Sequence, residues 1–401
     1  MKATINKSRA VGTITAPPSK SMAHRNLLCA ALSERSTVFN VEYSQDILAT
    51  LDSLKALGAN IEINGSTVNI GGFYPEKVKG TTLDCRESGS TLRFILPLCL
   101  LSGEEFILKG QGRLLQRPMT VYSDLCREKG IDFEQTNEYI RVKGRLKGGK
   151  FTVDGGISSQ FISGLLFALP LLKEDSVINI VGEIQSYSYL LLTFKSLTDF
   201  GIDVDYSDIR SIKIKGNQTY KNKEVKVEGD YSNSAFFDAL NFLDGDVKVE
   251  GLAEDSLQGD RVYKELFDKL NKENSVISIA DCPDLAPILF VMAAVGKGAL
   301  FTDTARLKIK ESDRAAAMQE ELSKFGVKMD VEDNSIRVYA SKIKTPTEEI
   351  NGHNDHRIVM ATAILSTKTG AVISGAEAVR KSLPDFFERL GSLNINVSWE
   401  R

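Results

Sequence analysis

The sequence has few of the residues from which metal centres, disulfides and nucleotide sites are built. Its 401 residues include three histidines without metal-ligand spacing, so we expect no metal centre. The five cysteines, an odd number with no C-x-x-C pair, are expected to be reduced structural thiols. G-x-x-x-x-G-K-[ST], G-x-G-x-x-G and G-x-S-x-G motifs are absent, so nucleotide-binding and serine-hydrolase sites lack their usual signatures.

Long apolar segments and an excess of one charge are also missing. The longest apolar stretch, Leu285 to Val295, is much shorter than the ~20 residues of a membrane helix. The opening residues MKATINKSRAVG lack the hydrophobic core of a signal peptide, which predicts a cytoplasmic protein. With 50 basic and 53 acidic residues, the net charge of −3 shows no excess of positive charge that would favour binding to nucleic acid or membranes. Any preference for anions must be local.

What the sequence does contain is a repeat. An amphipathic helix pattern ends near a glycine, and two alternating strand patterns joined by a polar turn follow it, as in LDSLKALGANIEINGSTVNIGG. We count six copies, of which LFDKLNKENSVISI and FFERLGSLNINVSWE are the weaker ones. The helices of the copies end near Gly58, Gly130, Gly201, Asn271, Gly326 and Gly391.

A second repeated element is a polar opening followed by an apolar helix. Each opening offers a residue that can cap the helix. The six openings are Ser19–Ser21, Glu87–Ser90, Ser158–Gln160, Asp230–Ser232, Pro283–Asp284 and Asp355–Arg357.

These repeats predict an α/β (α+β) fold of two similar domains, each with three units of two helices and a small sheet. Two large domains also suit the length, at about 150 residues per domain or more. The predicted domains are residues 14–226 and residues 1–13 plus 227–401, with the break near Glu224 to Asp230. The alternating pattern of Met1 to Thr13 has no helix before it, so we expect it to complete a sheet in the second domain.

The openings of the apolar helices collect basic, hydroxyl and glycine residues. A helix N-terminus has unpaired N–H groups and a partial positive charge, both of which favour anions. A single Ser or Asp there is most often only a cap. Openings that also carry cations indicate a site for phosphate or carboxylate groups. Those cations are Lys20, Arg25, Arg93, Arg314 and Arg357.

Each of these features also has an ordinary structural explanation. The charges from Arg306 to Arg314 are typical of a solvated helix face, and Arg113 and Arg117 fit equally well as surface charges. Asp284, a lone carboxylate ahead of the most apolar helix, is either a cap or, near several cations, a general base. The sequence pattern leaves these alternatives open.

Taken in order, the motifs of this chain resemble those of the EPSP synthase (3-phosphoshikimate 1-carboxyvinyltransferase) family from Pro17 to Phe387. They are Pro18–Ser21 with Arg25, Gly89–Arg93, Arg117–Pro118, Ser158–Gln160, Asp284, Lys310–Arg314, Asp355–Arg357 and Lys381. The resemblance implies a two-domain, inside-out α/β barrel fold, with the active site between domains that close around bound anions. It further implies transfer of the enolpyruvyl group of phosphoenolpyruvate to the 5-hydroxyl of shikimate 3-phosphate, by addition and elimination, in aromatic amino acid biosynthesis. We expect no cofactor, a monomer and inhibition by glyphosate.

The resemblance also divides the site residues between the two substrates. The residues implied to bind shikimate 3-phosphate are Lys20, Ser21, Arg25, Ser158, Ser159, Gln160, Ser186, Asp284 and Lys310. Those implied to bind phosphoenolpyruvate are Lys20, Gly89, Arg117, Gln160, Arg314, Arg357 and Lys381, and Arg93 joins the substrate-binding set by its helical spacing. Planar arginine groups suit this donor because it carries both a phosphate and a carboxylate. Asp284 with Lys310 close by is the expected base and Glu311 the expected acid, and Lys20 belongs to the catalytic set.

Two rival functions remain in view. The sister enolpyruvyl transferase that acts on UDP-N-acetylglucosamine is disfavoured, because residues 20–25 are Lys-Ser-Met-Ala-His-Arg rather than Lys-Asn-Ala-Ala and no cysteine lies between Arg113 and Pro118. A non-catalytic phosphometabolite sensor would keep the arginines but tolerate loss of the acid and base. Retention of Asp284, Lys310 and Glu311 argues against a sensor.

Overall fold

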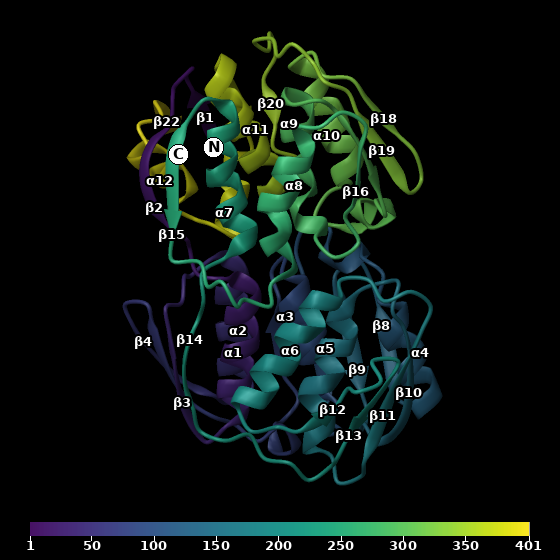
Figure 1. Ribbon diagram of the computed structural model, residues 1–401. Coiled ribbons are helices and arrows are strands. Elements are labelled where there is room, and N and C mark those ends of the chain that lie inside the picture. Colours follow the sequence, from purple (N-terminus) through teal and green to yellow (C-terminus); the bar gives the residue numbers. More distant parts are fainter. Residues whose placement is uncertain (401) are drawn as a thin grey trace. The chain divides into compact units, whose positions relative to one another are not determined.

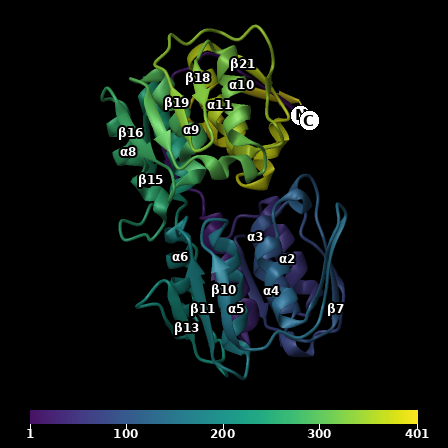
Figure 2. The same ribbon diagram turned by 90° about the vertical axis from the view of Figure 1, so that its right-hand side faces the viewer.

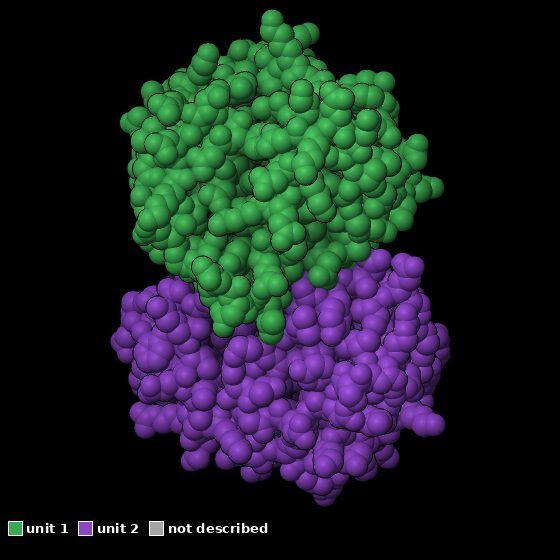
Figure 3. All heavy atoms as spheres, viewed as in Figure 1, with its two compact units in different colours: residues 1–17, 229–401 green, residues 18–228 purple. Residues whose placement is uncertain are grey.

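The computed structural model describes residues 1–400, and its contacts divide the chain into two compact units (Figure 3). The C-terminal unit comprises Met1–Pro17 and Gly229–Arg401, and the N-terminal unit comprises Pro18–Glu228. These bounds differ slightly from the predicted 14–226. Strand β2 (Val11–Thr15) pairs along its whole length with β15 (Asp246–Glu250), so residues 14 and 15 belong with the C-terminal unit.

The N-terminal unit consists of three copies of one strand-helix-strand-helix-hairpin motif. The first copy contains β14 (Glu224–Lys226), α1 (Lys20–Leu32), β3 (Arg35–Phe39), α2 (Gln45–Ala56), β4 (Asn60–Asn64) and β5 (Thr67–Gly71). The second contains β6 (Thr82–Asp84), α3 (Gly89–Cys99), β7 (Glu105–Lys109), α4 (Thr120–Lys129), β8 (Asp132–Gln135) and β9 (Tyr139–Lys143). The third contains β10 (Gly149–Asp154), α5 (Ser159–Ala168), β11 (Ser176–Val181), α6 (Tyr187–Asp199), β12 (Val204–Asp205) and β13 (Ser211–Ile214).

All three sheets of this unit have the same topology. Their strand orders are β14-β3-β5-β4, β6-β7-β9-β8 and β10-β11-β13-β12. In each, the first pair is parallel and the other two pairs are antiparallel. In the second and third sheets the apolar helices α3 and α5 supply the crossover that a parallel pair needs, whereas β14 reaches β3 from the end of the unit; a short turn suffices for each antiparallel hairpin.

The C-terminal unit repeats this topology with one truncation. One complete copy contains β16 (Ser275–Ser278), α9 (Ala286–Val295), β17 (Ala299–Thr302), α10 (Arg314–Lys324), β18 (Met329–Val331) and β19 (Ser335–Val338). The other contains β20 (Ile350–Asn351), α11 (His356–Thr369), β21 (Ala371–Ser374), α12 (Phe386–Ser392), β22 (Val397–Glu400) and β1 (Lys2–Ile5). The truncated copy contains β2, α7 (Tyr231–Asp238), β15 and α8 (Tyr263–Leu270). Strands β1 and β2 therefore both complete sheets of this unit, as expected for residues 1–13.

The prediction of a weak hairpin copy at LFDKLNKENSVISI is wrong. The strand after Asn271, β16, pairs in parallel with β17 and so begins the next copy. The two-stranded sheet is left with β15 at its edge, where the side chain of Asn241 takes the place of a neighbouring strand. Its Nδ2 donates to the carbonyl of Val247 at 2.8 Å, and its Oδ1 accepts the Val247 N–H at 2.7 Å.

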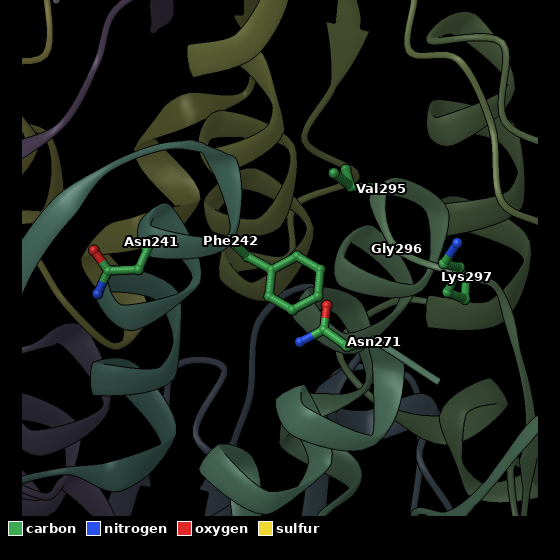
Figure 4. Close-up of a pocket in the computed structure, with 6 residues that line it drawn as sticks. All are labelled: Asn241, Phe242, Asn271, Val295, Gly296 and Lys297. Atoms are coloured by element: carbon green, nitrogen blue, oxygen red, sulfur yellow. The ribbon is translucent and has the colours of Figure 1, made fainter. Parts of the chain in front are cut away.

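Asn241 also belongs to the lining of a pocket of about 520 Å³ (Figure 4). The other lining residues are Phe242, Asn271, Val295, Gly296 and Lys297, which lie at the ends of α8, of α9 and of the 3-10 helix η4 (Ala239–Leu243). Figure 4 shows the side chains of these lining residues as sticks. The pocket thus lies between the copy that lacks a hairpin and the end of α9 in the next copy.

Each unit has its own core, with the apolar helices inside and the sheets outside (Figure 1 and Figure 2). Helices α3, α5 and α9 are buried along almost their whole length, and most of their side chains are apolar. Strands such as β7 alternate between buried and exposed residues, with one face on the core. The predicted fold class is confirmed. No helix within residues 1–400 is long and apolar enough to cross a membrane.

Five of the six predicted helix caps are present. The side chains of Ser19, Ser88, Ser158, Asp230 and Asp355 each accept a backbone N–H at the start of an apolar helix. The sixth opening differs, because Asp284 lies in a 3-10 turn (η6, Pro283–Leu285) and α9 has no side-chain cap. Its carboxylate is turned to other partners.

Candidate active site

Asp284 is surrounded by three cations of the C-terminal unit. Its Oδ1 lies 3.3 Å from Lys310 Nζ and 2.9 Å from Arg314 Nη1, and its Oδ2 lies 3.6 Å from Arg357 Nη2. Burial alone would raise the pKa of this carboxyl, but Lys310, Arg357 and Arg314 together hold its pKa well below the usual range. Asp284 is therefore ionised at neutral pH, and only loss or movement of a cation would make it a stronger proton acceptor.

Arg314, the first residue of α10, contacts three carboxylates of the C-terminal unit. Besides Asp284 it contacts Glu311 Oε2 at 2.8 Å and Asp355 Oδ2 at 2.9 Å. Its side chain is 1% exposed. Burial by itself would lower the pKa of Arg314, but the three carboxylates raise that pKa above its ordinary value. The group is a permanent cation held in one orientation.

Lys310 is the most titratable cation of the cluster. Burial lowers its pKa to about 8, although the charge of Asp284 opposes the shift. Arg314 and Arg306 add to the lowering through repulsion between like charges. A fraction of Lys310 is thus neutral near physiological pH, and this lysine can exchange a proton with a substrate.

Arg357 and Lys381 complete the cationic side of this unit. Arg357, the second residue of α11, is 3% exposed and donates to the carbonyl of Ser232 at 3.3 Å. Lys381, at the end of the 3-10 helix η8 (Ala376–Lys381), donates from Nζ to the carbonyl of Asn354 at 2.6 Å. Both lie beside the opening of α11, where backbone N–H groups also favour anions.

The N-terminal unit gathers its candidates at the openings of α1, α3, α5 and α6. Lys20, the first residue of α1, forms a 2.7 Å ion pair with Asp46. Arg25, one turn further, is buried and donates to Thr193 Oγ1 at 2.9 Å and to the carbonyls of Ser21 and Tyr189. Burial lowers the pKa of Arg25 to about 10, so its guanidinium remains charged at neutral pH.

Two guanidinium groups lie beside the bare backbone of Gly89. A Cβ atom added to this glycine would be 2.9 Å from an Nη1 atom of both Arg93 and Arg117. Arg93 Nη1 donates to Gln160 Oε1 at 2.6 Å, and Gln160 Nε2 donates to Ser90 Oγ at 2.9 Å. The openings of α3 and α5 are therefore joined by direct side-chain bonds.

The predicted serines occupy helix starts. Ser158 caps α5, and Ser159 is the buried first residue of that helix. Ser186 is the buried residue before α6 and has a left-handed backbone with φ of 56°. Ser21 lies in the first turn of α1. Of the sixteen candidates, ten lie in the N-terminal unit and six, Asp284, Lys310, Glu311, Arg314, Arg357 and Lys381, lie in the C-terminal unit.

Several groups of these clusters were not predicted as site residues. Asp355 was predicted within a helix opening and as part of the Asp355–Arg357 motif, but without a role of its own, yet its carboxylate accepts from Arg314, Ser312 and the Arg357 N–H. Asp46, the partner of Lys20, follows a helix cap and gives no signal of its own in the sequence. In the sequence, only the neighbouring His-Arg pair and the following apolar helix could have indicated that Asp355 belongs to the site.

One group of potential metal ligands exists within residues 1–400: Glu320, Glu321 and His353. The buried carboxylate of Glu321 already accepts from Lys324 Nζ at 2.8 Å and from the Asn351 N–H at 2.9 Å. A metal would have to displace the charge of Lys324. The arrangement is that of a hydrogen-bonded ion cluster rather than of an open metal site.

The same fold occurs in enolpyruvyl transferases of known structure. EPSP synthase from Acinetobacter baumannii superposes with a TM-score of 0.79 at 23% identity, over 99% of this chain and 100% of that one. The enolpyruvyl transferase NikO from Streptomyces tendae superposes with a TM-score of 0.78 at 14% identity, over 99% of this chain and 98% of that one. The architecture is therefore that of the enolpyruvyl transferases.

Sequence comparison identifies the family within the enolpyruvyl transferase fold. The pattern of the family described as EPSP synthase (3-phosphoshikimate 1-carboxyvinyltransferase) matches residues 5–390. A 3-phosphoshikimate 1-carboxyvinyltransferase from Clostridium kluyveri is 40% identical over 98% of this chain and 97% of the relative. The chain belongs to the EPSP synthase family.

Proposed function

We propose that this chain transfers the enolpyruvyl group of phosphoenolpyruvate to the 5-hydroxyl of shikimate 3-phosphate and releases phosphate. The family match and the full-length relatives support the reaction. The single observation in the site that carries it is Asp284, an ionised carboxylate within 3.6 Å of Lys310, Arg314 and Arg357. A base beside three cations suits a reaction in which a hydroxyl must be deprotonated next to a phosphorylated, carboxylated donor.

In the proposed addition step, Asp284 with Lys310 takes the proton of the 5-hydroxyl, and that oxygen bonds to C2 of phosphoenolpyruvate. Glu311 gives a proton to the C3 methylene, which becomes a methyl group. In the elimination step a proton leaves this methyl group, the C2–C3 double bond forms again and the C2–O bond to phosphate breaks. Microscopic reversal of the proton movements allows one acid and one base to serve both steps.

The remaining candidates are proposed as binding groups. Phosphoenolpyruvate would contact Arg314, Arg357 and Lys381 together with Lys20, Gly89, Arg117 and Gln160. Shikimate 3-phosphate would contact Lys20, Ser21, Arg25, Ser158, Ser159, Gln160 and Ser186 together with Asp284 and Lys310. Arg93 would orient Gln160, to which it donates at 2.6 Å.

We also propose that the protein is a cytoplasmic monomer that glyphosate inhibits. The five buried free thiols within residues 1–400 suit a reducing compartment.

Phosphate release with both substrates tests this proposal. We expect release that depends on phosphoenolpyruvate and shikimate 3-phosphate, and none when UDP-N-acetylglucosamine replaces shikimate 3-phosphate. Binding of both ligands without phosphate release would instead favour a sensor.

A variant of Glu311 tests the assignment of the acid. Glu311→Gln should bind shikimate 3-phosphate normally but turn over ~10² times more slowly or worse, because an amide of the same size cannot deliver the proton. Near-normal turnover in Glu311→Gln would remove Glu311 from the mechanism while leaving the overall reaction in place.

A further inference from the structure

Helix α10 holds the segment 351–355 at both ends. Arg314, at the start of the helix, donates to Asp355 Oδ2 at 2.9 Å. Glu321, seven residues later and so on the same face, accepts the Asn351 N–H at 2.9 Å and lies 2.8 Å from His353 Nε2. The segment is therefore attached to α10 at positions on either side of residue 354.

The backbone between these attachments is strained. His353 and Asn354 are consecutive non-glycine residues with left-handed φ values of 49° and 51°. Left-handed φ is uncommon outside glycine, and although Asn and His adopt it more readily than most residues, two in succession depend on the surrounding contacts. The contact from His353 Nε2 to Glu321 Oε1 at 2.8 Å joins this turn directly to α10.

The strained turn positions groups proposed to bind the donor. It directs the carbonyl of Asn354 to Lys381 Nζ at 2.6 Å. It also brings the next residue, Asp355, to Arg314 and to the backbone N–H of Arg357. Lys381, Arg314 and Arg357 are the three cations of the C-terminal unit proposed for phosphoenolpyruvate, so a relaxed turn would disturb all three.

Glu321 is suited to holding the turn at residues 353 and 354 in place. It is fully buried, and burial tends to raise its pKa, but hydrogen bonds from His353, Lys324 and the Asn351 N–H outweigh burial and hold that pKa below its usual value. The carboxylate is thus ionised and has a partner on each oxygen. No residue of the proposed substrate sites contacts it in the part of the chain that the structure describes.

From this geometry we infer that Glu321 and His353 are positioning residues for the donor: they hold the left-handed turn at residues 353 and 354 that sets Lys381, Arg314 and Arg357. The inference rests on the proposed function, because it takes these cations to bind phosphoenolpyruvate. It assigns Glu321 and His353 no contact with a substrate.

The test compares two substitutions at one position. His353→Ala and His353→Gly both remove the imidazole, but glycine adopts a left-handed φ readily and alanine does not. We expect His353→Ala to raise the KM for phosphoenolpyruvate about tenfold with kcat and the KM for shikimate 3-phosphate within about twofold. His353→Gly should raise the donor KM by about threefold or less, because its backbone retains the turn more easily.

Two further variants separate positioning from folding. Glu321→Gln keeps the size of the side chain but loses its charge, and should raise the donor KM in the same way as His353→Ala. Glu320→Gln is the matched control, since Glu320 is exposed and its carboxylate lies 3.9 Å from His353 Nε2, and it should leave both KM values unchanged. Thermal unfolding of every variant reports whether the fold is retained.

Equal donor KM values for His353→Ala and His353→Gly, or equal rises for both substrates, would overturn the inference. Direct calorimetric titration with phosphoenolpyruvate in the presence of shikimate 3-phosphate gives the same comparison without turnover. A wild-type protein that binds phosphoenolpyruvate but releases no phosphate would contradict the proposed function. The titrations of the variants would still decide the role of the turn.

Discussion

Arg314 and Asp355 form an ion pair that is almost closed to solvent. Arg314 Nε lies 2.9 Å from Asp355 Oδ2, and the two side chains are 1% and 0% exposed. An unpaired charge at this depth is costly, and Asp355 is the most deeply buried of the three carboxylates that contact Arg314. The pair also joins the openings of α10 and α11, from which Arg314 and Arg357 reach into the candidate site.

Breaking this pair should destabilise the C-terminal unit strongly. Asp355→Asn keeps a side chain that can cap α11 but removes the fully buried one of the three carboxylates around Arg314, so we expect a loss of about 3 kcal/mol in the free energy of unfolding. Asp313→Asn is the control, because Asp313 caps α10 without pairing to a buried cation, and should cost less than about 1 kcal/mol. Urea unfolding measures both. Equal losses would contradict a special role for the pair.

The low pKa of Lys310 predicts a pH dependence of substrate binding. In the free protein Lys310 loses its proton as the pH rises through about 8, the value to which burial lowers its pKa. If the lysine cation attracts shikimate 3-phosphate, the Kd should rise above about pH 8, by up to tenfold per pH unit. Lys310→Arg remains charged and should show a flat profile over the same range. Calorimetric titrations with the same slope in both proteins would remove Lys310 from anion binding.

Gly89 offers a test of the proposed donor site. A methyl group at this position would meet the guanidinium groups of Arg93 and Arg117 at 2.9 Å, so these side chains must shift in Gly89→Ala. Glyphosate is longer than phosphoenolpyruvate, and we expect its inhibition constant to rise by a larger factor than the KM for phosphoenolpyruvate. Gly391→Ala, whose added Cβ would find its nearest neighbour only at 4.0 Å, is the control. Equal factors for the two ligands would place Gly89 outside the donor site.

Asn241 should protect the open edge of β15. In Asn241→Ala the N–H and carbonyl of Val247 lose their partners, which we expect to cost about 1–2 kcal/mol of unfolding free energy. The freed edge should also promote self-association, because unpaired strand edges accept further strands. Asn271→Ala, in the same pocket but with no such bond to a strand among the described residues, is the control (Figure 4). Light scattering that does not distinguish the two variants would contradict this role.

The sequence by itself determined the repeated elements, most of the helix caps and the family. Helical and strand periodicity, the glycines that end helices and the Ser or Asp caps are properties of a few neighbouring residues, so they can be recognised without knowledge of the packing. The motif order from Pro18 to Lys381 likewise led to the correct family before any contact was known.

Only the tertiary structure decided which groups meet. The sequence pattern left Asp284 as either a cap or a base, and the tertiary structure places it against Lys310 and Arg314, which are 26 and 30 residues away along the chain. The truncated copy was misassigned because a strand pattern carries no mark of its pairing partner, and β16 pairs with β17 instead of forming a hairpin. The contact from Glu321 to His353 gave no signal in the sequence. Strand register, buried ion pairs and strained turns depend on how distant segments pack, whereas periodicity and caps depend only on neighbours along the chain.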